Sequence, residues 1–211
     1  LDLSQYQRIV PIGIADCITE LSAGVIVFAF NHQILSIIGT SGVVSYTVMT
    51  YVYNLVLMAF VGIAQGCQPL VSYAVGQQDS KTIKLVYRYG LTAVALTSVL
   101  CFGGCWIFTP QIVSVFIRPQ ETALFGSTVA AFRLYSFCFL IMGYNVLTSG
   151  FFVALAKPKA ALTLSLARGI VVILACLLAM SSVFGALGIW LTPTVSEGLC
   201  LVLSFILLIK A

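Results

Sequence analysis

The chain has 211 residues, of which 61% are hydrophobic and 8% are charged. A soluble globular domain carries roughly 25% charged residues, because water surrounds it on every side. The composition therefore excludes such a domain, and the formal net charge of +4 is explained by cations in loops rather than by a nucleic-acid partner.

Charge-free apolar stretches are the main signal of the fold. Each is long enough to cross a bilayer, which takes about 20 apolar residues per helix, and none shows the alternation of barrel strands. With Gly, Pro and charged residues as boundaries, the sequence predicts six transmembrane helices, near residues 9–33, 45–72, 89–109, 125–150, 162–181 and 185–208. The predicted fold class is an all-α membrane protein whose residues 1–211 form a single lobe without a soluble domain.

Two carboxylates lie inside the first predicted span, at Asp16 and Glu20. Their separation of four residues puts them on one face of a helix. An ionisable group at membrane depth is costly and marks an ion or substrate path by default. A hydrated position near the interface is the simpler explanation for Asp16. Asn31 begins a polar end of the same span, which is a candidate contact for a substrate.

The second predicted span contains the sequence GIAQGCQPL, with Gln65, Gln68 and Pro69. Small residues at this spacing favour close helix packing, and Pro69 removes the hydrogen bond to the carbonyl of Gln65. The two glutamines are therefore either hydrogen-bonding groups for a ligand or part of a packed, bent helix.

Polar residues also interrupt the fourth and sixth predicted spans. Tyr144 and Asn145 follow Met142 in the fourth, and aromatic and methionine side chains suit bulky organic cations, although such a stripe is often plain core. Glu197 lies in the sixth span, four residues after Pro193. It either lines a cavity or closes a hydrogen bond between helices.

The cations are distributed unevenly between the two sides of this topology. Eight of the ten lysines and arginines fall on one side. These are the cations of the loops 76–88 and 157–159, together with Arg8, Lys210 and Arg168, which is taken to extend to the interface. Arg118 and Arg133 are the exceptions. Because cytoplasmic loops hold the excess of Lys and Arg, both ends of the segment are expected in the cytoplasm, with the spans in the plasma membrane.

The usual motifs of enzymes and metal sites are missing from the sequence. It holds no phosphate loop, no G-x-S-x-G and no H-E-x-x-H, and no Ser, His and Asp set that could form a catalytic triad around its one histidine, His32. Its seven cysteines lack metal-type spacing. We therefore expect no enzyme activity, no cofactor and no metal site beyond a binding position for Na⁺ at Glu20.

Three passages resemble the multidrug and toxic compound extrusion transporters, and specifically the second six-helix half of the bacterial members. Residues 51–84, with the pattern GIAQG-x-QPL, look like that family's eighth helix and the loop after it. Residues 11–31, with Glu20 and Phe30-Asn31, are similar to its seventh helix. Residues 150–168 resemble its GFFxALxKPK turn and eleventh helix.

The resemblance implies one lobe of a twelve-helix transporter that exports drugs and other organic, often cationic, compounds in exchange for Na⁺ or H⁺. It implies that Glu20 is the coupling carboxylate, and that the partners are a missing N-terminal six-helix lobe and the lipid bilayer. The start at Leu1 without a methionine fits a segment of a longer protein. Some members carry a second acid on the tenth helix, where this chain has Tyr144 and Asn145.

Two other functions remain open on the sequence alone. One is a flippase for lipid-linked saccharides on a related fold, although such proteins line their cavity with several cations, and only Arg133 and Arg168 approach membrane depth here. The other is a membrane scaffold that does not transport. The presence of a further six-helix lobe upstream would separate a transporter half from a scaffold.

Overall fold

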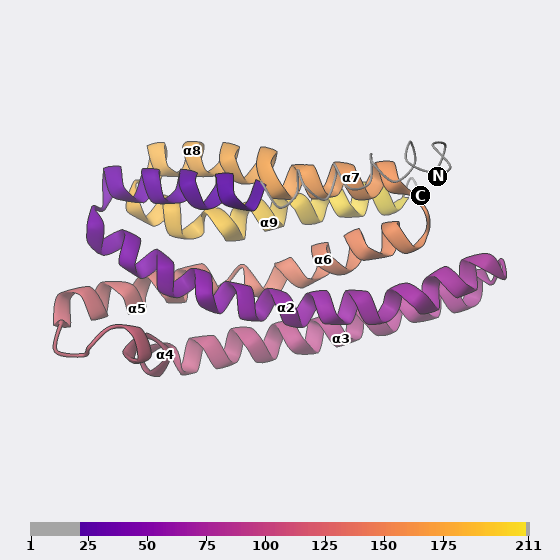
Figure 1. Ribbon diagram of the computed structural model, residues 1–211, viewed down its shortest axis with the longest axis horizontal. Helices are drawn as coiled ribbons and strands as arrows, with labels where there is room; N and C mark the ends of the chain where they lie inside the picture. Colours follow the sequence, from indigo (N-terminus) through magenta and orange to yellow (C-terminus); the bar gives the residue numbers. More distant parts are fainter. Residues whose placement is uncertain (1–21, 210–211) are drawn as a thin grey trace, which may run out of the picture.

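The structure is a computed structural model that describes residues 22–209, apart from the side chain of Pro158. This part of the chain consists of helices joined by short turns (Figure 1). In chain order they are the helix Ser22–Ile37, α2 (Thr40–Gly76), α3 (Ser80–Ile107), α4 (Thr109–Phe116), α5 (Thr122–Ser136), α6 (Phe139–Ala154), α7 (Pro158–Leu166), the π-helical turn η1 (Ala167–Val171), α8 (Val172–Phe184) and α9 (Ala186–Ile209).

The helices follow the order of the predicted spans. Four are long and apolar enough to cross a membrane: α2, α3, the continuous stretch Lys159–Phe184 and α9. A fifth span is the pair α5 and α6, which is bent by 43°. The helix Ser22–Ile37 is apolar but shorter over the residues that the structure covers. The all-helical membrane fold is confirmed, with the count of six spans approximate.

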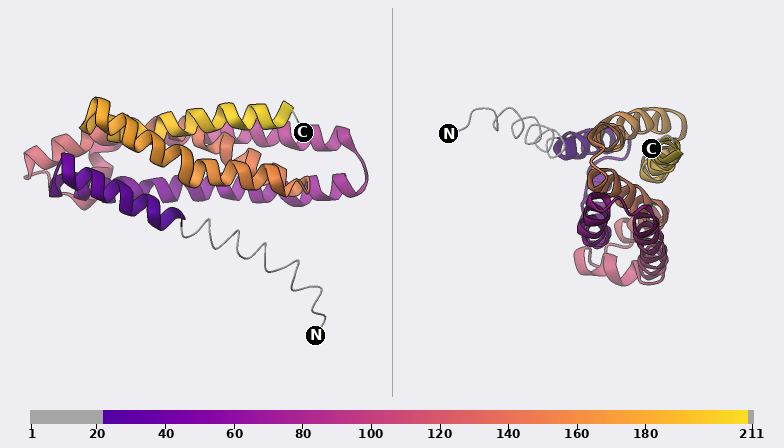
Figure 2. Two further views of the ribbon diagram at one scale, coloured as in Figure 1. Left: turned by 90° about the horizontal axis from the view of Figure 1, so that it is seen from above. Right: turned by 90° about the vertical axis from the view of Figure 1, so that its right-hand side faces the viewer.

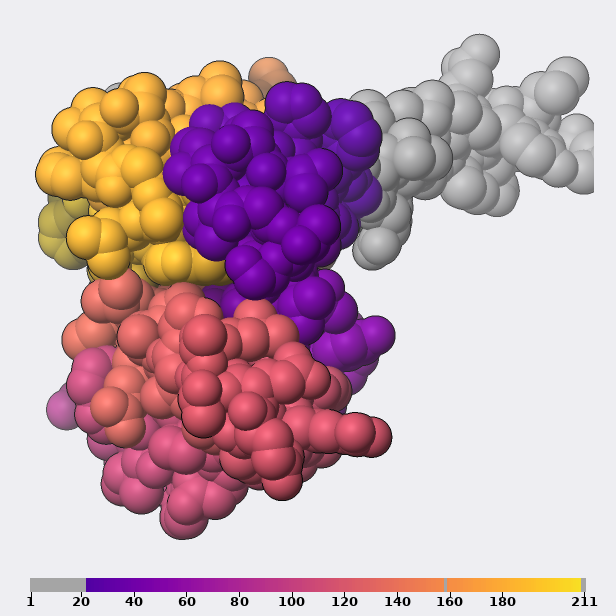
Figure 3. Space-filling view, turned by 90° about the vertical axis from the view of Figure 1, so that its left-hand side faces the viewer, coloured from indigo at the N-terminus to yellow at the C-terminus, as the bar shows by residue number. Residues whose placement is uncertain are grey.

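The helices form two layers, which are clearest along the bundle axis (Figure 2). One layer contains the helix Ser22–Ile37, α7–α8 and α9, and the other contains α2, α3, α5 and α6, with α6 and α5 contacting α9 between the layers. At one end, the helix Ser22–Ile37 lies beside α8 and above α4 and α5 (Figure 3). A hydrogen bond from Gln33 Nε2 to Ser181 Oγ, 2.8 Å long, joins the first two of these helices.

The connection between α2 and α3 is much shorter than the predicted loop 76–88. Only Gln77, Gln78 and Asp79 lie outside the helices. Asp79 caps α3, because its carboxylate accepts hydrogen bonds from the backbone of Lys81 and Thr82. The hydroxyl of Thr82 also donates to this carboxylate, and these bonds lower the pKa of Asp79. The cap lets α3 start at Ser80, so the prediction of a long loop was wrong.

The fourth span is broken where the sequence shows no proline or glycine. Around Phe137 and Cys138 the backbone bonds connect residues three apart, with Cys138 N donating to Tyr135 O and Leu140 N to Phe137 O. This tighter pattern, typical of short 3₁₀ turns, separates α5 from α6. The span predicted near 125–150 is therefore present as the bent pair α5 and α6 and not as one continuous helix, whereas α2 continues through Pro69 to Gly76.

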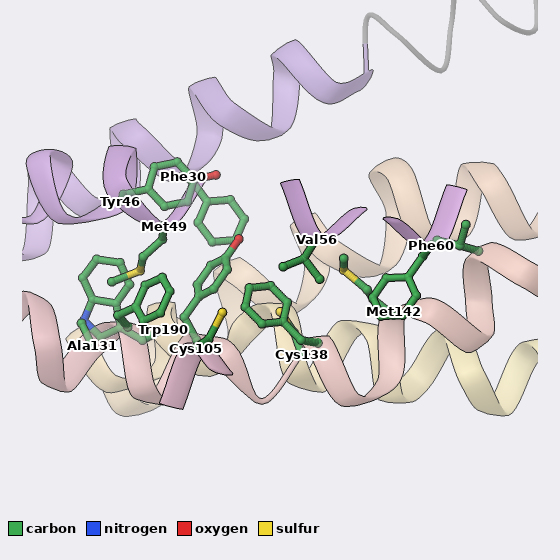
Figure 4. Close-up of a cluster of buried hydrophobic side chains, with 14 of the residues drawn as sticks. Phe30, Tyr46, Met49, Val56, Phe60, Cys105, Ala131, Cys138, Met142 and Trp190 are labelled. Carbon is green, nitrogen blue, oxygen red and sulfur yellow. The ribbon is translucent and has the colours of Figure 1, made fainter. Parts of the chain in front are cut away.

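A continuous hydrophobic core joins the two layers (Figure 4). Phe60 of α2 and Met142 of α6 are fully buried and point toward each other in this view. Next to them, Gly143 lets α6 approach α2 and α3 closely. A Cβ atom built at Gly143 would lie 2.5 Å from Phe60 Cδ1 and 2.8 Å from Val94 Cγ1.

Gly143→Ala is expected to lower the stability of the lobe, by about 1–3 kcal/mol, because overpacking a closed core forces side chains out of their preferred rotamers. Gly126→Ala on α5 is the matched control, since a Cβ there would meet nothing within 4 Å. The measurement is the thermal unfolding midpoint of both variants in detergent. Equal midpoints for the two variants would show that the Gly143 contact does not limit packing.

Candidate functional site

A cavity of about 690 Å³ lies between the two layers. It is bounded by the helix Ser22–Ile37 and α2, by α5 and α6, and by α7 to α9 with the turn η1. The lining residues are Ala23, Gly24, Ile26, Val27, Phe30, Tyr46, Thr50, Tyr53, Asn54, Leu57, Tyr135, Ser149, Leu164, Ser165, Arg168, Gly169, Ile173, Pro193, Ser196 and Glu197. The volume falls within the range of roughly 300–1,000 Å³ that is typical of pockets for small organic molecules.

Aromatic rings form one wall of the cavity. Phe30 and Tyr46 stack with their ring centroids 5.2 Å apart, and Figure 4 shows the two rings at the boundary between the layers. Tyr53 meets Tyr135 edge to face at 6.2 Å. Such rings offer large, flat apolar surfaces with hydroxyl groups at their edges, which suits an aromatic ligand.

An ion pair between residues of two candidate membrane spans also lines the cavity. Arg168 Nε lies 2.8 Å from Glu197 Oε1, and the side chains are 23% and 6% exposed, respectively. Asn145 Nδ2 donates to Glu197 Oε2 at 2.7 Å and to the backbone carbonyl of Glu197 at 2.9 Å. Ser204 Oγ in turn donates to Asn145 Oδ1 at 2.9 Å. Both carboxylate oxygens of Glu197 are thus engaged by donors from α6 and η1.

Local departures from regular helix geometry position this pair. Arg168 lies in the π-helical turn η1, and such turns inside α-helices occur frequently at functional sites. Pro193 lies inside α9 and leaves the carbonyl of Ile189 without its usual donor. Pro193, Ser196 and Glu197 all line the cavity, as residues three and four apart on one helix face do.

The structure corrects the sequence interpretation of Arg168. Its side chain was expected to extend to the membrane interface, but it turns into the lobe and binds Glu197. The physical reason is that a buried carboxylate is strongly destabilising unless an opposite charge and hydrogen bonds accompany it. Glu197 lines the cavity and also connects α9 to α6 and η1 through its hydrogen bonds, so the two alternatives for its position do not exclude each other.

The predicted site residues are only partly brought together. Asn145 and Glu197 are in direct contact. Tyr144 is half-buried, and its backbone carbonyl accepts a bond from Thr148. Asp16 and Glu20 lie outside the residues that the structure describes, so their predicted role is not tested by it.

Of the predicted site residues that the structure describes, Glu197 lines the cavity, whereas the others do not: Asn31, Gln65, Gln68, Tyr144 and Asn145. Gln65 is exposed, and the side chain of Gln68 packs near Gly150 of α6. Asn31 is half-buried, and its Oδ1 atom is buried with no hydrogen-bond partner within the described part of the chain.

Sequence reasoning missed the polar residues Tyr53, Asn54 and Ser165, which line the cavity. Tyr53 and Asn54 come before the sequence GIAQGCQPL, and the two glutamines of that sequence were the ligand-binding candidates of the second predicted span. A signal was available, because a tyrosine and an asparagine side by side in an apolar helix need polar surroundings. No group of three His, Cys, Asp or Glu side chains that could hold a metal ion occurs between residues 22 and 209.

Comparisons with known proteins agree on one family. The MatE family model matches residues 34–178, which is more than half of the chain. The multidrug export protein MepA of Staphylococcus haemolyticus (strain JCSC1435) is 22% identical over 200 residues, with 93% of this chain and 42% of that protein covered.

Solved structures show the same fold. An inward-facing conformation of a multidrug resistance MATE family transporter of the MOP superfamily gives a TM-score of 0.86 at 17% identity, over 95% of this chain and 46% of that one. A crystal structure of MATE in complex with MaL6 gives a TM-score of 0.85 at 17% identity, over 92% and 44%. The chain spans less than half the length of these relatives. It therefore belongs to the MatE family, the multidrug and toxic compound extrusion transporters, as a half-length segment with the fold of those transporters.

Proposed function

We propose that this chain is the C-terminal lobe of an antiporter that exports small organic compounds in exchange for Na⁺ or H⁺. The observation that supports it most is the aromatic cavity with a buried ion pair, inside a lobe that has the MATE fold. Ionisable groups are costly within a membrane and by default mark the path of a solute or an ion. The export of drugs by a family member such as MepA adds to this argument.

Glu20 is the proposed coupling residue, assisted by Asp16. In the sequence, Glu20 comes four residues before Gly24 and seven before Val27, and both of these line the cavity. Residues at these spacings share one face of a helix. A carboxylate at this position would take up H⁺ or Na⁺, and a cationic compound would compete with the ion for the same negative charge.

A second lobe is the proposed partner. The chain covers 46% of the inward-facing transporter and 44% of an outward-facing one, and its fold matches both about equally well, with TM-scores of 0.86 and 0.85. This agreement is what we expect if a lobe keeps its internal fold while it rotates against its partner. The transported compound would then bind between or within the two lobes.

The charges in the cavity favour this function over a flippase for lipid-linked saccharides. A diphosphate head group calls for several free cations. Within the described residues, the charged side chains that line the cavity are Arg168 and Glu197, and they neutralise each other. Arg133 does not line the cavity and lies over the ring of Trp106.

The 211-residue chain expressed alone should give no drug resistance, because an alternating-access cavity forms between two repeats. Co-expression with the lobe that completes it should restore resistance. The measurement is the growth of a drug-sensitive host at matched expression, with size-exclusion chromatography to exclude a homodimer. Resistance from the monomeric segment would contradict the half-transporter assignment, whereas inactivity of the complete protein would support a scaffold.

The orientation of the lobe is testable by cysteine labelling. The α2–α3 and α6–α7 connections lie at the same end of the bundle, opposite the α4–α5 connection (Figure 1). In a cysteine-free background, single cysteines at Ser80 and Lys159 should resist an impermeant thiol reagent in intact cells, and one at Gln120 should react. Labelling of Ser80 from outside would reverse the proposed topology, in which both ends are cytoplasmic.

A further inference from the structure

The first turns of α3 carry a basic face that does not line the cavity. This face consists of Lys81, Lys84 and Arg88, which are all exposed and share one side of the helix through their spacings of three and four residues. Their side chains make no ion pair within the described part of the chain. Asp79 is the only acid of α2, α3 and the connection between them, and its carboxylate is engaged in capping α3. The basic face therefore keeps an excess of positive charge.

An apolar stripe continues the basic face along the rest of α3. It consists of Leu85, Tyr89, Leu96 and Leu100, whose side chains are all at least half exposed. At 3.6 residues per turn these positions lie on the same side of the helix as the three cations. The opposite side, which includes the fully buried Val94, packs against α2 and α6. A lipid with an anionic head group has the matching arrangement, with charge at one end and apolar chains along the bilayer normal.

The length of α3 places the basic face at the level of the lipid head groups. Its 28 residues extend about 42 Å, which matches a bilayer including its head-group regions, about 40–45 Å. Residues 89–107 carry no charge and extend about 28 Å, close to the hydrocarbon thickness of about 30 Å. The α2–α3 connection also reaches beyond the α6–α7 connection at this end of the bundle (Figure 1 and Figure 2). The three cations are therefore expected beside the lipid phosphates.

We propose that α3 binds an anionic phospholipid, with the head-group phosphate on the basic face and an acyl chain along the apolar stripe. Arg88 suits the phosphate because a guanidinium presents parallel N–H donors, and the two lysines add positive charge. Tyr89 lies at the boundary between the two regions, where tyrosine is enriched in membrane proteins. The site does not depend on the proposed antiport. The topology places it in the cytoplasmic leaflet, which the cysteine labelling tests separately.

Quenching of a fluorophore by spin-labelled lipid measures the occupancy of this site. Leu85→Cys in a cysteine-free form of the complete two-lobe protein is labelled with bimane and reconstituted into phosphatidylcholine bilayers. Nitroxide-labelled phosphatidylglycerol or phosphatidylcholine is added at equal mole fraction. Phosphatidylglycerol should quench with an apparent association constant at least about fivefold higher, the factor that one cation near the surface contributes. Equal quenching by the two lipids would overturn the proposal. Val183→Cys, exposed near the end of α8, is the matched control and should show equal quenching.

Removal of the cations assigns the preference to the basic face. Lys81→Gln/Lys84→Gln/Arg88→Gln should lower the ratio of the two association constants to about one. Lys159→Gln removes an exposed cation at the same end of the bundle and should leave the ratio unchanged. A ratio that survived the triple substitution would contradict the proposal.

The ionic strength gives a second test with all three cations in place, which holds even if the triple variant fails to insert. A rise from about 0.01 M to about 1 M salt shortens the Debye length from about 30 Å to about 3 Å. The preference for phosphatidylglycerol at Leu85→Cys should then decrease towards one. A preference that does not change with salt would exclude the basic face as its cause.

A soluble phosphate is the competing ligand for the same cations. Glycerol 3-phosphate carries a phosphate group without acyl chains, so it cannot use the apolar stripe. At millimolar concentration it should leave the quenching by phosphatidylglycerol at Leu85→Cys unchanged. Loss of this quenching would show that the cations bind a soluble phosphate, and the assignment to a lipid would be wrong.

Discussion

Glu20→Gln in the complete two-lobe protein should reduce gradient-driven drug efflux to the level of protein-free liposomes. Glutamine keeps the size and hydrogen bonding of glutamate but is permanently neutral, so it can neither take up a proton nor neutralise Na⁺. Antiport requires that the ion and the drug each weaken the binding of the other by one reciprocal coupling free energy. A residue that cannot change charge removes that coupling, while insertion of the apolar helix into the membrane is unaffected.

Asp16→Asn is the matched control for this variant and should reduce efflux less, because Asp16 comes four residues before Glu20 in the sequence and is therefore expected closer to the cytoplasmic end of the proposed topology. The measurement is drug efflux from proteoliposomes under an imposed Na⁺ or H⁺ gradient, with reconstitution matched. Wild-type rates in Glu20→Gln would show that this carboxylate has only a structural role.

Glu197→Leu should destabilise the lobe by about 3–5 kcal/mol, which is more than the effect expected for Gly143→Ala. The substitution leaves the Arg168 guanidinium buried without its counter-ion and removes an acceptor from Asn145. The loss of stability comes from the guanidinium charge that is left without a partner and not from the intrinsic strength of the pair. Removing both charges of a buried pair often changes the stability very little. The double variant Arg168→Gln/Glu197→Gln should therefore be clearly more stable than Glu197→Leu.

Thermal unfolding in detergent measures this difference. Glu121→Leu is the control, because Glu121 is exposed before α5 and its replacement should leave the midpoint unchanged. If the double variant unfolded as early as Glu197→Leu, the loss would come from damaged packing and not from an unpaired charge.

The order of the spans could be predicted from the sequence because it depends on the lengths of apolar runs. The ends of the helices depend on local hydrogen bonds that hydrophobicity does not report. Asp79 starts α3 well before the predicted boundary, and the tight turn at Phe137 and Cys138 breaks α5 from α6 without proline or glycine. Polarity alone therefore predicts the order of the elements and approximately their number, but not their limits.

The sequence also predicts only part of the candidate site: the identity of its polar residues, but not the contacts between them. Glu197 and Asn145 were predictable as polar residues inside apolar spans. Their contact with each other, and with Arg168, depends on how α6, α9 and η1 are aligned along their axes. The π-helical turn at Ala167–Val171 changes that alignment, and the amino-acid composition of this segment does not predict such a turn. For this reason the sequence predicts Arg168 at the interface, whereas the structure places it in the lining of the cavity.

In the proposed antiporter, the movement of the ion and the movement of the drug are coupled. The most direct test reverses the usual experiment, with no ion gradient at the start. A drug gradient is imposed across proteoliposomes that contain the complete protein, and the movement of Na⁺ and H⁺ is recorded with ion-sensitive dyes. The drug gradient is expected to drive one of these cations in the opposite direction in the wild type and not in Glu20→Gln. Drug movement down its gradient without any opposing cation flux in the wild type would contradict it.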